Sequence, residues 1–443
     1  MKNFNLFASI ALLFVTSLSV TAQLRDIDKI LPERQRAEVV NQWLEWRLDN
    51  LIPELMRREG IDMWIIMCRE TNEDPVFWSM LPEPLMHARR LTTLIFFDPG
   101  EGKQVERLSG SGNLGGGFKA TWTDKSISQW ESLSQLINRL DPKKIGVNIS
   151  GHHRSADGLS ASLRDSLTDA LSQKYAKRMV SAEMLSIGWL ETRSEEELVF
   201  YRHLCGIAHD LIREFFSNGV ITPGITTTDD VEWWIRDRIT LLGLETWFPP
   251  TIDLQRSPEL TEKYRDDASV IRHGDLLHCD VGIRYMRLCT DMQWHAYVLK
   301  PGEEEAPEGL KQALQNAIRV ADIFMGEFRE GVTGHEIATL THQKAEAEGL
   351  QLTLYSHPIG YYGHSAGTSI DTRSASQLPP GMHEIMKYPL HLNTVYAIEF
   401  GCYTPVPEWN NKRVAISYEE QGVMTASGCS WVDGNQREFL LIR

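Results

Sequence analysis

The sequence has few cysteines, no long uncharged apolar run after its first residues, and fewer basic than acidic residues. Its six cysteines are spread over 443 residues without a CxxC pair, which argues against a thiolate zinc site or a disulfide scaffold. An even count permits a bridge, but Cys279 and Cys289 lie in β-prone runs typical of buried small residues. The net charge of −15 disfavours nucleic acid or an anionic membrane surface as a partner.

The first 22 residues have the pattern of an export signal. Lys2 supplies a positive start, residues 6–20 form an apolar run, and Val20-Thr21-Ala22 provides small residues at a cleavage site. We therefore expect residues 1–22 to be a signal peptide and the protein to be exported, to the periplasm or the medium. No run reaches the ~20 apolar residues that cross a bilayer, so no membrane span is predicted.

Two domains are expected, because about 420 residues exceed what one hydrophobic core commonly supports. Residues 31–184 alternate between helical and strand patterns and predict an α/β unit. Helices are expected over 34–58, with a break at Pro53, and over 128–140. Buried strands are expected over 63–67, 94–97 and 144–147.

A second unit is predicted to begin shortly before Ser194, with the boundary near Ser186. Ser194 and Glu197 form a capping-box pattern that starts a helix reaching about Phe216. From there a helix, glycine turn and second helix occur twice, ending near Leu244 and again near residue 350. This duplication predicts two helix pairs packed against one curved sheet, an α+β fold with a site where the halves meet.

Acidic residues follow strand-like runs in the first half of this unit. Asp280 and Asp291 lie eleven residues apart, after the β-prone residues 276–279 and 286–290. This pattern predicts a hairpin of two strands that places the two carboxylates side by side.

The second half supplies further groups of the same kind. Glu399 and Glu419 each end a β-prone run, and His357 lies in a His-x-x-Gly turn. Four carboxylates and one imidazole suit divalent cations, and a pair of adjacent metals needs carboxylates that can bridge them. The sequence therefore predicts a dinuclear site.

These residues, in this order and spacing, resemble the pita-bread metallopeptidase family of Xaa-Pro aminopeptidases, prolidases, methionine aminopeptidases and the non-metal enzyme creatinase. The resemblance implies a signal peptide over 1–22, a creatinase-type α/β domain over 23–185 and a pita-bread catalytic domain over 186–443. In that catalytic domain, two pseudo-symmetric halves form a curved antiparallel sheet with helices outside.

The resemblance also implies a role for each site residue. The metal ligands would be Asp280, Asp291, His357, Glu399 and Glu419, with Asp291 and Glu419 bridging the two ions. The ions would be Mn²⁺ in the first place, with Zn²⁺, Co²⁺ or Fe²⁺ as alternatives. Glu399 would also shuttle protons, and His364, seven residues after His357, would donate to the reacting carbonyl oxygen.

The sequence departs from the family pattern in the substrate-binding residues. Residues 251–268 contain no histidine, and Thr353 stands where a histidine often precedes the ligand by four residues. Phe400 and Ser417 replace a common proline and arginine. The metal ligands are complete, so these changes affect specificity more than chemistry.

The segment around His364 allows two other interpretations. Taking His364 as the ligand would leave Asp371, and no second histidine, seven residues on; the His357 register keeps both histidines and is preferred. Residues 363–367 also spell G-x-S-x-G, a nucleophile motif that needs a strand before it and a helix after it. Residues 355–362 lack an apolar strand pattern and no helix is expected after Gly367, so a serine hydrolase is disfavoured.

The resemblance implies hydrolysis of the bond between an N-terminal residue and a following proline, with a peptide as substrate. A prolidase-type dipeptidase is the alternative within the family. A catalytically silent peptide-binding protein is the alternative of another class, although peptide binding does not require four converging acids. Family members are often dimers, so the resemblance allows a homodimer.

Overall fold

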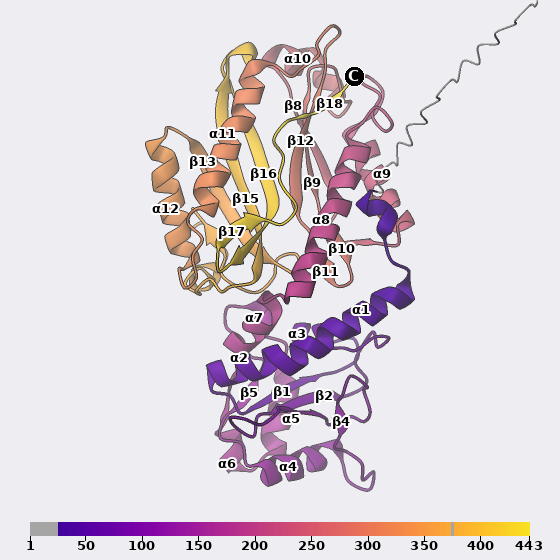
Figure 1. Cartoon of the computed structure of the whole chain (residues 1–443), viewed down its shortest axis with the longest axis vertical. Helices are drawn as coiled ribbons and strands as arrows, with labels where there is room; N and C mark the ends of the chain where they lie inside the picture. Colours follow the sequence, from indigo (N-terminus) through magenta and orange to yellow (C-terminus); the bar gives the residue numbers. More distant parts are fainter. Residues whose placement is uncertain (1–24, 374–375) are drawn as a thin grey trace, which may run out of the picture.

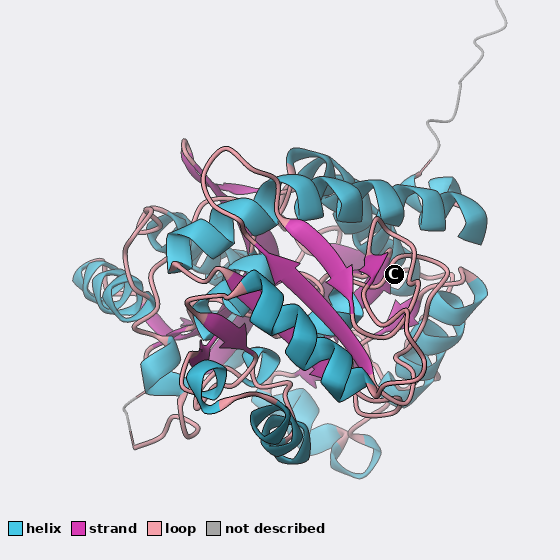
Figure 2. Ribbon diagram, turned by 90° about the horizontal axis from the view of Figure 1, so that it is seen from below, coloured by secondary structure: helices cyan, strands magenta, loops and turns pink. Residues whose placement is uncertain are grey.

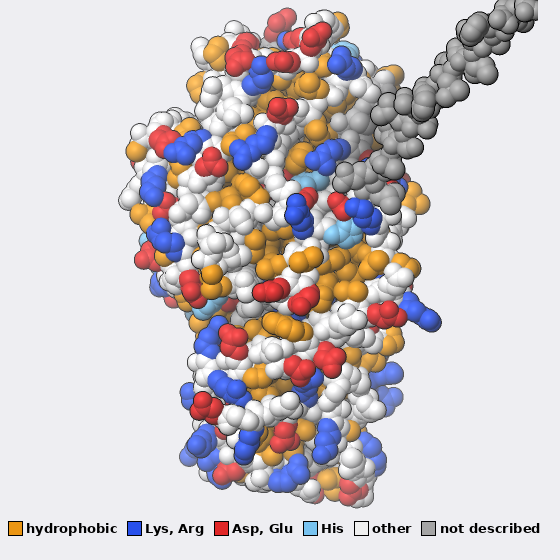
Figure 3. Space-filling view, in the orientation of Figure 1, with side chains coloured by type: hydrophobic (Ala, Val, Ile, Leu, Met, Phe, Trp, Pro, Cys, Tyr) orange, Lys and Arg blue, Asp and Glu red, His pale blue; other side chains and the backbone are white. Residues whose placement is uncertain are grey.

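The computed structural model describes residues 25–373 and 376–443. The predicted signal peptide, residues 1–22, lies outside this range. Two units are stacked along the long axis of the molecule, the N-terminal one below in Figure 1. Charged side chains of both signs are interspersed over the face in Figure 3. Among the described residues, no helix combines the length and apolar character needed to cross a membrane.

The lower unit is built on a six-stranded sheet in the order β4-β3-β2-β1-β5-β6. Its strands are β1 (Met63–Cys68), β2 (Thr92–Phe97), β3 (Glu106–Ser109), β4 (Lys119–Ala120), β5 (Ile145–Val147) and β6 (Met179–Ser181). Its shorter helices are α3 (Pro75–Ser79), α4 (Gln129–Leu140), α5 (Ala161–Ala170) and α6 (Gln173–Ala176). The central strand β1 is buried along its whole length, and alternate residues feed the cores on its two faces. The strands and the helix expected here are confirmed.

The first long helix is interrupted earlier than expected. It consists of α1 (Glu33–Trp46), a wider π-helical segment (Arg47–Leu51) and α2 (Ile52–Glu59). Pro53 is the second residue of α2, and Leu51 and Ile52 before it are also helical, so the π-helical segment directly precedes the proline. The break predicted at Pro53 is therefore displaced to the π segment, and Gly60, with φ of +62°, ends α2.

The predicted boundary near Ser186 falls inside a helix, α7 (Glu183–Glu191). Residues Leu185 and Leu190 of α7 share a hydrophobic core with Leu55 of α2. Three residues then lead to α8 (Glu195–Phe215), which begins with the expected Ser194–Glu197 capping box. The division into 23–185 and 186–443 stays a prediction.

The upper unit holds a nine-stranded sheet, in which β14-β13-β15-β16-β12-β9-β8 are adjacent, β17 pairs with β16 and β18 with β12. The strands are β8 (Thr251–Gln255), β9 (Leu276–Val281), β12 (Met292–Val298), β13 (Gln351–Ile359), β14 (Ile370–Asp371), β15 (Thr394–Val406), β16 (Lys412–Thr425), β17 (Gly428–Trp431) and β18 (Leu440–Ile442). Figure 2 shows the molecule from below, with helices around its strands.

The predicted duplication is confirmed by two helix pairs, α8 with α9 (Thr228–Leu241) and α11 (Glu308–Met325) with α12 (Gly334–Ala347). The second helix of each pair starts with a capping box, Thr227–Asp230 and Thr333–Glu336. Helix α9 packs on β8, and α11 packs on β15 and β16. The α+β class is therefore confirmed. Two short helices, α10 (Pro258–Lys263) and α13 (Met382–Ile385), complete the unit.

The two aspartates lie on paired strands, but not on a simple hairpin. Strands β9 and β12 pair directly with each other in antiparallel orientation. Between them in the sequence is a separate hairpin of β10 (Ile283–Tyr285) and β11 (Leu288–Cys289), and β10 pairs with β7 (Glu245–Thr246). Met286 and Arg287 form its turn with φ of 48° and 70°. Taking 286–290 as the strand that carries Asp291 was wrong, because this turn breaks the run and β12 starts only after Asp291.

All six cysteines are free, so the bridge that their even number permits is not formed. Cys279 lies in β9 and Cys289 in β11, both fully buried. Their interpretation as small core residues is confirmed.

Candidate metal centre

Four of the five residues predicted as metal ligands lie on strands of the large sheet, and the fifth directly precedes a strand; these five strands are consecutive in the sheet. His357 lies on β13, Glu399 on β15, Glu419 on β16 and Asp280 on β9, while Asp291 directly precedes β12. Glu399 is paired with Glu419, and Gln293 is paired with both Glu419 and Asp280. Since Asp291 is two residues from Gln293 and alternate residues share a face, the five side chains form one row across the sheet.

The side-chain atoms of this row lie within a few ångströms of one another. His357 Nε2 is 3.7 Å from Asp291 Oδ2, 3.8 Å from Glu399 Oε2 and 3.9 Å from Glu419 Oε1. Ligand atoms of Asp280, Asp291 and Glu419 likewise lie within 4.8 Å of one another. Glu419 belongs to both groups, which places it where a bridging ligand of two cations would be.

Several atoms of the cluster are buried and unpaired. Asp280 Oδ1, Asp291 Oδ1, His357 Nε2 and Glu419 Oε1 are shielded from solvent and make no hydrogen bond with the described residues. Buried polar atoms in proteins are nearly always paired, so four unpaired acceptors in one place need a partner. A divalent cation fits this set, because it binds oxygen and imidazole nitrogen atoms and supplies positive charge.

His357 is held in the form that binds a metal. Its Nδ1–H donates to the carbonyl oxygen of Pro358 at 3.1 Å, which leaves the Nε2 lone pair facing the carboxylates. Burial, followed by the charge of His364, lowers the pKa of His357 to about 3. The imidazole is therefore neutral at physiological pH.

The carboxylates are strongly perturbed by burial and by one another. Burial raises the pKa of Asp280 to about 6. Burial and then the charge of Asp280 raise the pKa of Glu399 to about 8. Burial and neighbouring carboxylates also raise the pKa of Asp291 and of Glu419 well above the ordinary range. Without a cation, the cluster therefore holds its protons to unusually high pH.

His364 lies beside the cluster, as predicted, but at its exposed edge. Its ring centroid is 4.4 Å from that of His357 and 5.3 Å from that of Trp247. Burial and the charge of Arg154 lower the pKa of His364. An imidazole at this place can reach a substrate that approaches the carboxylates from solvent.

The alternative that takes His364 as the ligand, which leaves Asp371 at the position seven residues on, is not favoured. Asp371 is engaged by the guanidinium of Arg373, with Nε 2.9 Å from Oδ2. His364 can still approach the cluster, since its ring nitrogen lies within 4.8 Å of ligand atoms of Asp291 and His357. The structure thus brings both histidines to one place, with His357 the more deeply buried.

Of the two arguments against a serine hydrolase, the structure contradicts one and supports the other. Residues 355–359 do form part of a strand, β13, so the expectation that no strand precedes Ser365 was wrong. Pairing with β15 holds this polar segment extended. After Gly367 the chain enters β14 rather than a helix, so the strand–turn–helix geometry of a nucleophile elbow is not formed.

Two residues of the site were missed by the sequence interpretation. Gln293 Nε2 donates to Glu399 Oε1 at 3.1 Å and to Glu419 Oε2 at 2.7 Å. Trp247 donates to the carbonyl oxygen of Thr290, and a Cβ at Gly363 would lie 2.3 Å from its ring. Gln293 could have been found from its spacing of two from Asp291, whereas the place of Trp247 depends on tertiary packing.

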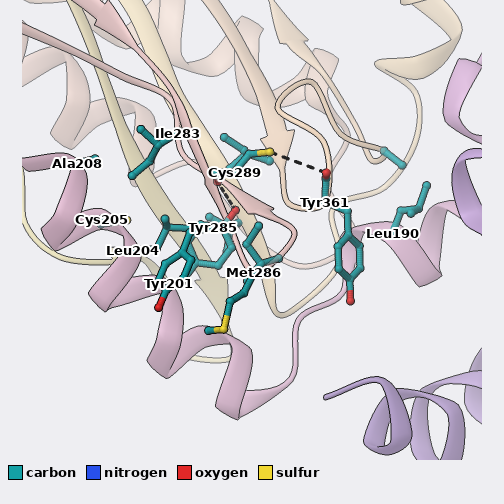
Figure 4. Close-up of a cluster of buried hydrophobic side chains, with 14 of the residues drawn as sticks. Leu190, Tyr201, Leu204, Cys205, Ala208, Ile283, Tyr285, Met286, Cys289 and Tyr361 are labelled. Atoms are coloured by element: carbon teal, nitrogen blue, oxygen red, sulfur yellow. Dashed lines mark hydrogen bonds between the residues drawn. The ribbon is translucent and has the colours of Figure 1, made fainter. Parts of the chain in front are cut away.

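Figure 4 shows a buried cluster that includes Tyr201, Cys289 and Tyr361, which are joined by hydrogen bonds. Cys289 N–H donates to the carbonyl oxygen of Gly360 at 2.9 Å, and its thiol approaches the carbonyl oxygen of Tyr361 at 3.8 Å. Tyr201 on α8 donates to the carbonyl oxygen of Cys289 at 2.7 Å. These contacts join the segment before Asp291 to the turn between the two histidines.

The model of metallopeptidase family M24 matches residues 200–426. An uncharacterized peptidase of Bacillus subtilis, YqhT, is 23% identical over 272 residues, which are 56% of this chain and 64% of that protein. A methionine aminopeptidase of Thermococcus kodakarensis is 27% identical over 184 residues, 41% of this chain and 56% of that protein. The match thus spans less than two thirds of either relative.

Solved structures extend the similarity to both units. The X-Pro aminopeptidase from Thermotoga maritima superposes with a TM-score of 0.61 at 17% identity, over 88% of this chain and 99% of that one. The Xaa-Pro dipeptidase from Bacillus anthracis gives 0.58 at 14% identity, over 91% and 99%. The predicted pita-bread fold with its N-terminal domain is confirmed. Since the family model covers more than half of the sequence, the chain belongs to metallopeptidase family M24.

Proposed function

We propose that this metallopeptidase is a dinuclear aminopeptidase that releases an N-terminal residue from a peptide whose second residue is proline. The observation that carries the proposal is the cluster of four unpaired, buried acceptor atoms at residues Asp280, Asp291, His357 and Glu419. The names of similar structures, an X-Pro aminopeptidase and an Xaa-Pro dipeptidase, support the choice of substrate.

Five side chains would hold the metal ions: Asp280, Asp291, His357, Glu399 and Glu419. We propose that Asp291 and Glu419 would be the ligands shared by the two ions, because each belongs to two of the ligand groups and, unlike His357, offers two oxygen atoms. An oxygen-rich set with one histidine favours Mn²⁺, with Zn²⁺, Co²⁺ and Fe²⁺ as alternatives. When bound, divalent ions lower the pKa of water and polarise the scissile carbonyl group.

The chain's own residues would then position the peptide and move protons. Glu399 would take a proton from the attacking water and deliver it to the leaving nitrogen. One of its oxygens lies 3.8 Å from His357 Nε2, within the ligand cluster. His364 donates a hydrogen bond to the carbonyl oxygen as negative charge develops there. Its place at the exposed edge, 4.4 Å from the ring of His357, suits this role.

A prolidase-type dipeptidase is the second candidate, and one observation favours it. The guanidinium of Arg154, an exposed side chain of the lower unit, lies 3.4 Å from the backbone oxygen of His364. No ion pair of Arg154 is found within the described ranges, so its charge is free to meet the carboxylate of a short peptide. Cleavage rates of an Xaa-Pro dipeptide and of a longer peptide with the same first two residues separate the two candidates.

The proposal is tested on purified protein freed of metal and reloaded with Mn²⁺. We expect two ions per chain by elemental analysis and metal-dependent cleavage of Xaa-Pro peptides, both lost in Asp280→Asn. Equal activity in Asp280→Asn would overturn the mechanism. A wild-type protein that takes up no stoichiometric metal would instead support a catalytically silent peptide-binding protein.

Export and assembly form a separate part of the proposal. We propose that residues 1–22 are removed on export, which predicts a mature protein that begins at Gln23. N-terminal sequencing of protein from the periplasm or medium tests this. The homodimer that the family resemblance allows is tested by light scattering.

A further inference from the structure

Gln293 is a buried amide in the middle of the candidate metal centre. It lies on β12, two residues after Asp291, and is paired with Asp280 on one side and Glu419 on the other. Only 8% of it is exposed to solvent. A neutral side chain therefore stands in a row that otherwise consists of ligand candidates.

The amide of Gln293 is fully engaged. Its Nε2 donates to Glu399 Oε1 at 3.1 Å and to Glu419 Oε2 at 2.7 Å, which uses both N–H bonds. Its Oε1 accepts from the Nε2–H of His278 at 2.9 Å. A flipped amide would direct its oxygen at two carboxylates and its N–H group at the donor of His278, so this network fixes the orientation.

The bonds from Gln293 divide the oxygens of each glutamate into two kinds. Glu399 Oε1 and Glu419 Oε2 face the amide, whereas Glu399 Oε2 and Glu419 Oε1 lie 3.8 Å and 3.9 Å from His357 Nε2. Glu419 Oε1 is one of the buried, unpaired acceptors. One side chain thus leaves an open oxygen on each glutamate facing the same imidazole nitrogen.

We propose that Gln293 is a positioning residue that selects the metal-binding oxygens of Glu399 and Glu419, with His278 holding its amide in the required orientation. This inference rests on the proposed function, since it assumes that the cluster binds divalent cations. Hydrogen bonds to ligating carboxylates commonly change metal affinity by about 10- to 100-fold. Gln293 would contribute in this way without adding a charge.

The neutrality of Gln293 matters because of the charges around it. A lysine or arginine would also donate to both glutamates, but its positive charge would compete with the cation. A glutamate would add a fifth carboxylate and could donate only when protonated. His278 is itself anchored, since its Nδ1 lies 3.5 Å from Asp253 Oδ2 on the neighbouring strand β8.

The test compares Gln293→Met with a matched control, Gln255→Met. Gln255 lies on β8 and its amide bonds only to the backbone of Ala415, with Nε2 to O at 2.7 Å and N to Oε1 at 3.1 Å. Mn²⁺ is titrated calorimetrically into each metal-free protein. We expect affinity to fall about 10- to 100-fold in Gln293→Met and to stay unchanged in Gln255→Met. His278→Leu should show a smaller loss, since it frees the amide without removing it.

Kinetics provide a readout that a loss of stability alone would not change. The concentration of Mn²⁺ needed for half of full activity should rise by the same factor as the calorimetric Kd.

The measurements distinguish a failure of this inference from a failure of the proposed function. Wild-type affinity in Gln293→Met, with metal binding to the wild-type protein intact, would overturn the inference. A wild-type protein without metal binding would overturn the proposed function instead. If Gln293→Met does not fold by circular dichroism, Gln293→Asn keeps a neutral amide but shortens the side chain by one methylene and withdraws its N–H groups from the two glutamates, and unchanged affinity in that variant would overturn the inference equally.

Discussion

Arg47 and Glu197 form an ion pair between the two units in which neither side chain is exposed to solvent. Arg47 Nη1 lies 2.9 Å from Glu197 Oε2, and Arg193 approaches the other oxygen at 3.4 Å. Tyr361 donates to the same carboxylate at 3.1 Å. Because Tyr361 lies in the turn between His357 and His364, this pair connects the first helix of the chain to the candidate site.

Glu197→Gln is expected to destabilise the protein strongly, because it leaves two buried guanidinium groups without a counter-charge. Removal of one partner of a buried ion pair costs about 3–5 kcal/mol. Urea unfolding of the wild type and the variant measures the change in the free energy of unfolding. Asp165→Asn, which breaks the exposed Arg164–Asp165 pair, is the control and should change little. An equally small effect in both variants would contradict the structural role of Glu197.

The stability of the metal-free protein should fall as the pH rises from about 4 to about 8. The folded-state pKa values of the cluster carboxyls are raised by burial, Asp280 to about 6 and Glu399 to about 8, while unfolded carboxyls titrate near about 4. In this window the folded state binds more protons than the unfolded state, so each rise in pH favours unfolding. Melting temperatures at pH 5 and pH 8 measure the effect.

Addition of Mn²⁺ is the matched comparison for this pH dependence. A bound cation replaces the protons that the metal-free cluster retains, so the fall in melting temperature between pH 5 and pH 8 should be reduced or reversed. An identical pH profile with and without Mn²⁺ would show that these carboxyls do not bind the metal.

His209 is predicted to stabilise the protein only while it is protonated. It lies 3.0 Å from Glu420 Oε1 and 3.2 Å from Asp433 Oδ2. Burial lowers its pKa, but the two carboxylates outweigh burial and raise the pKa of His209 to about 9. Against an ordinary value of about 6.5 this shift corresponds to roughly 2–4 kcal/mol, present below pH ~6.5 and lost as the pH rises through about 9.

His209→Asn measures this contribution through its pH dependence. The difference in the free energy of unfolding between wild type and variant should be largest near pH 6 and shrink toward pH 10. A difference that is the same at both pH values would indicate that His209 contributes through packing rather than through its charge.

Much of the fold could be predicted from the sequence, because the start of a helix or the position of a buried strand depends mainly on adjacent residues. The capping box at Ser194 marked the start of α8, and the apolar run at 63–67 marked a strand buried on both faces. The turn at Met286 and Arg287 was missed, since both adopt positive φ without being glycine. Tertiary packing of the β10–β11 hairpin imposes that conformation, and no local pattern in the sequence shows it.

The same distinction between local sequence signals and tertiary packing applies to the candidate site. The candidate ligands could be named from residue type and order, because four acids and a histidine after β-prone runs point to one chemistry, although Glu399 and Glu419 lie inside β15 and β16 rather than at strand ends. The bonds from Gln293 to Glu399 and Glu419 depend on which strands pair and in which register. Register across β12, β15 and β16 joins Gln293 to glutamates more than a hundred positions away. The spacing of two places Gln293 on the same face as Asp291, but it does not reveal which glutamates the amide contacts.

His364→Asn should separate catalysis from metal binding. The ring of His364 lies at the exposed edge of the cluster, 4.4 Å from His357, and is proposed to stabilise charge on the substrate rather than to hold an ion. Loss of one such hydrogen-bond donor costs about 10²–10³ in kcat. We therefore expect kcat for an Xaa-Pro peptide to fall by this factor, while elemental analysis still finds the wild-type metal content.

Asp291→Asn should lose metal and activity together, because Asp291 belongs to two of the ligand groups. His383→Asn, a change of an exposed histidine on α13, is the matched control and should alter neither quantity. Loss of metal in His364→Asn would instead show that His364 binds a metal ion. That result would favour the alternative in which His364, and not His357, is the histidine ligand.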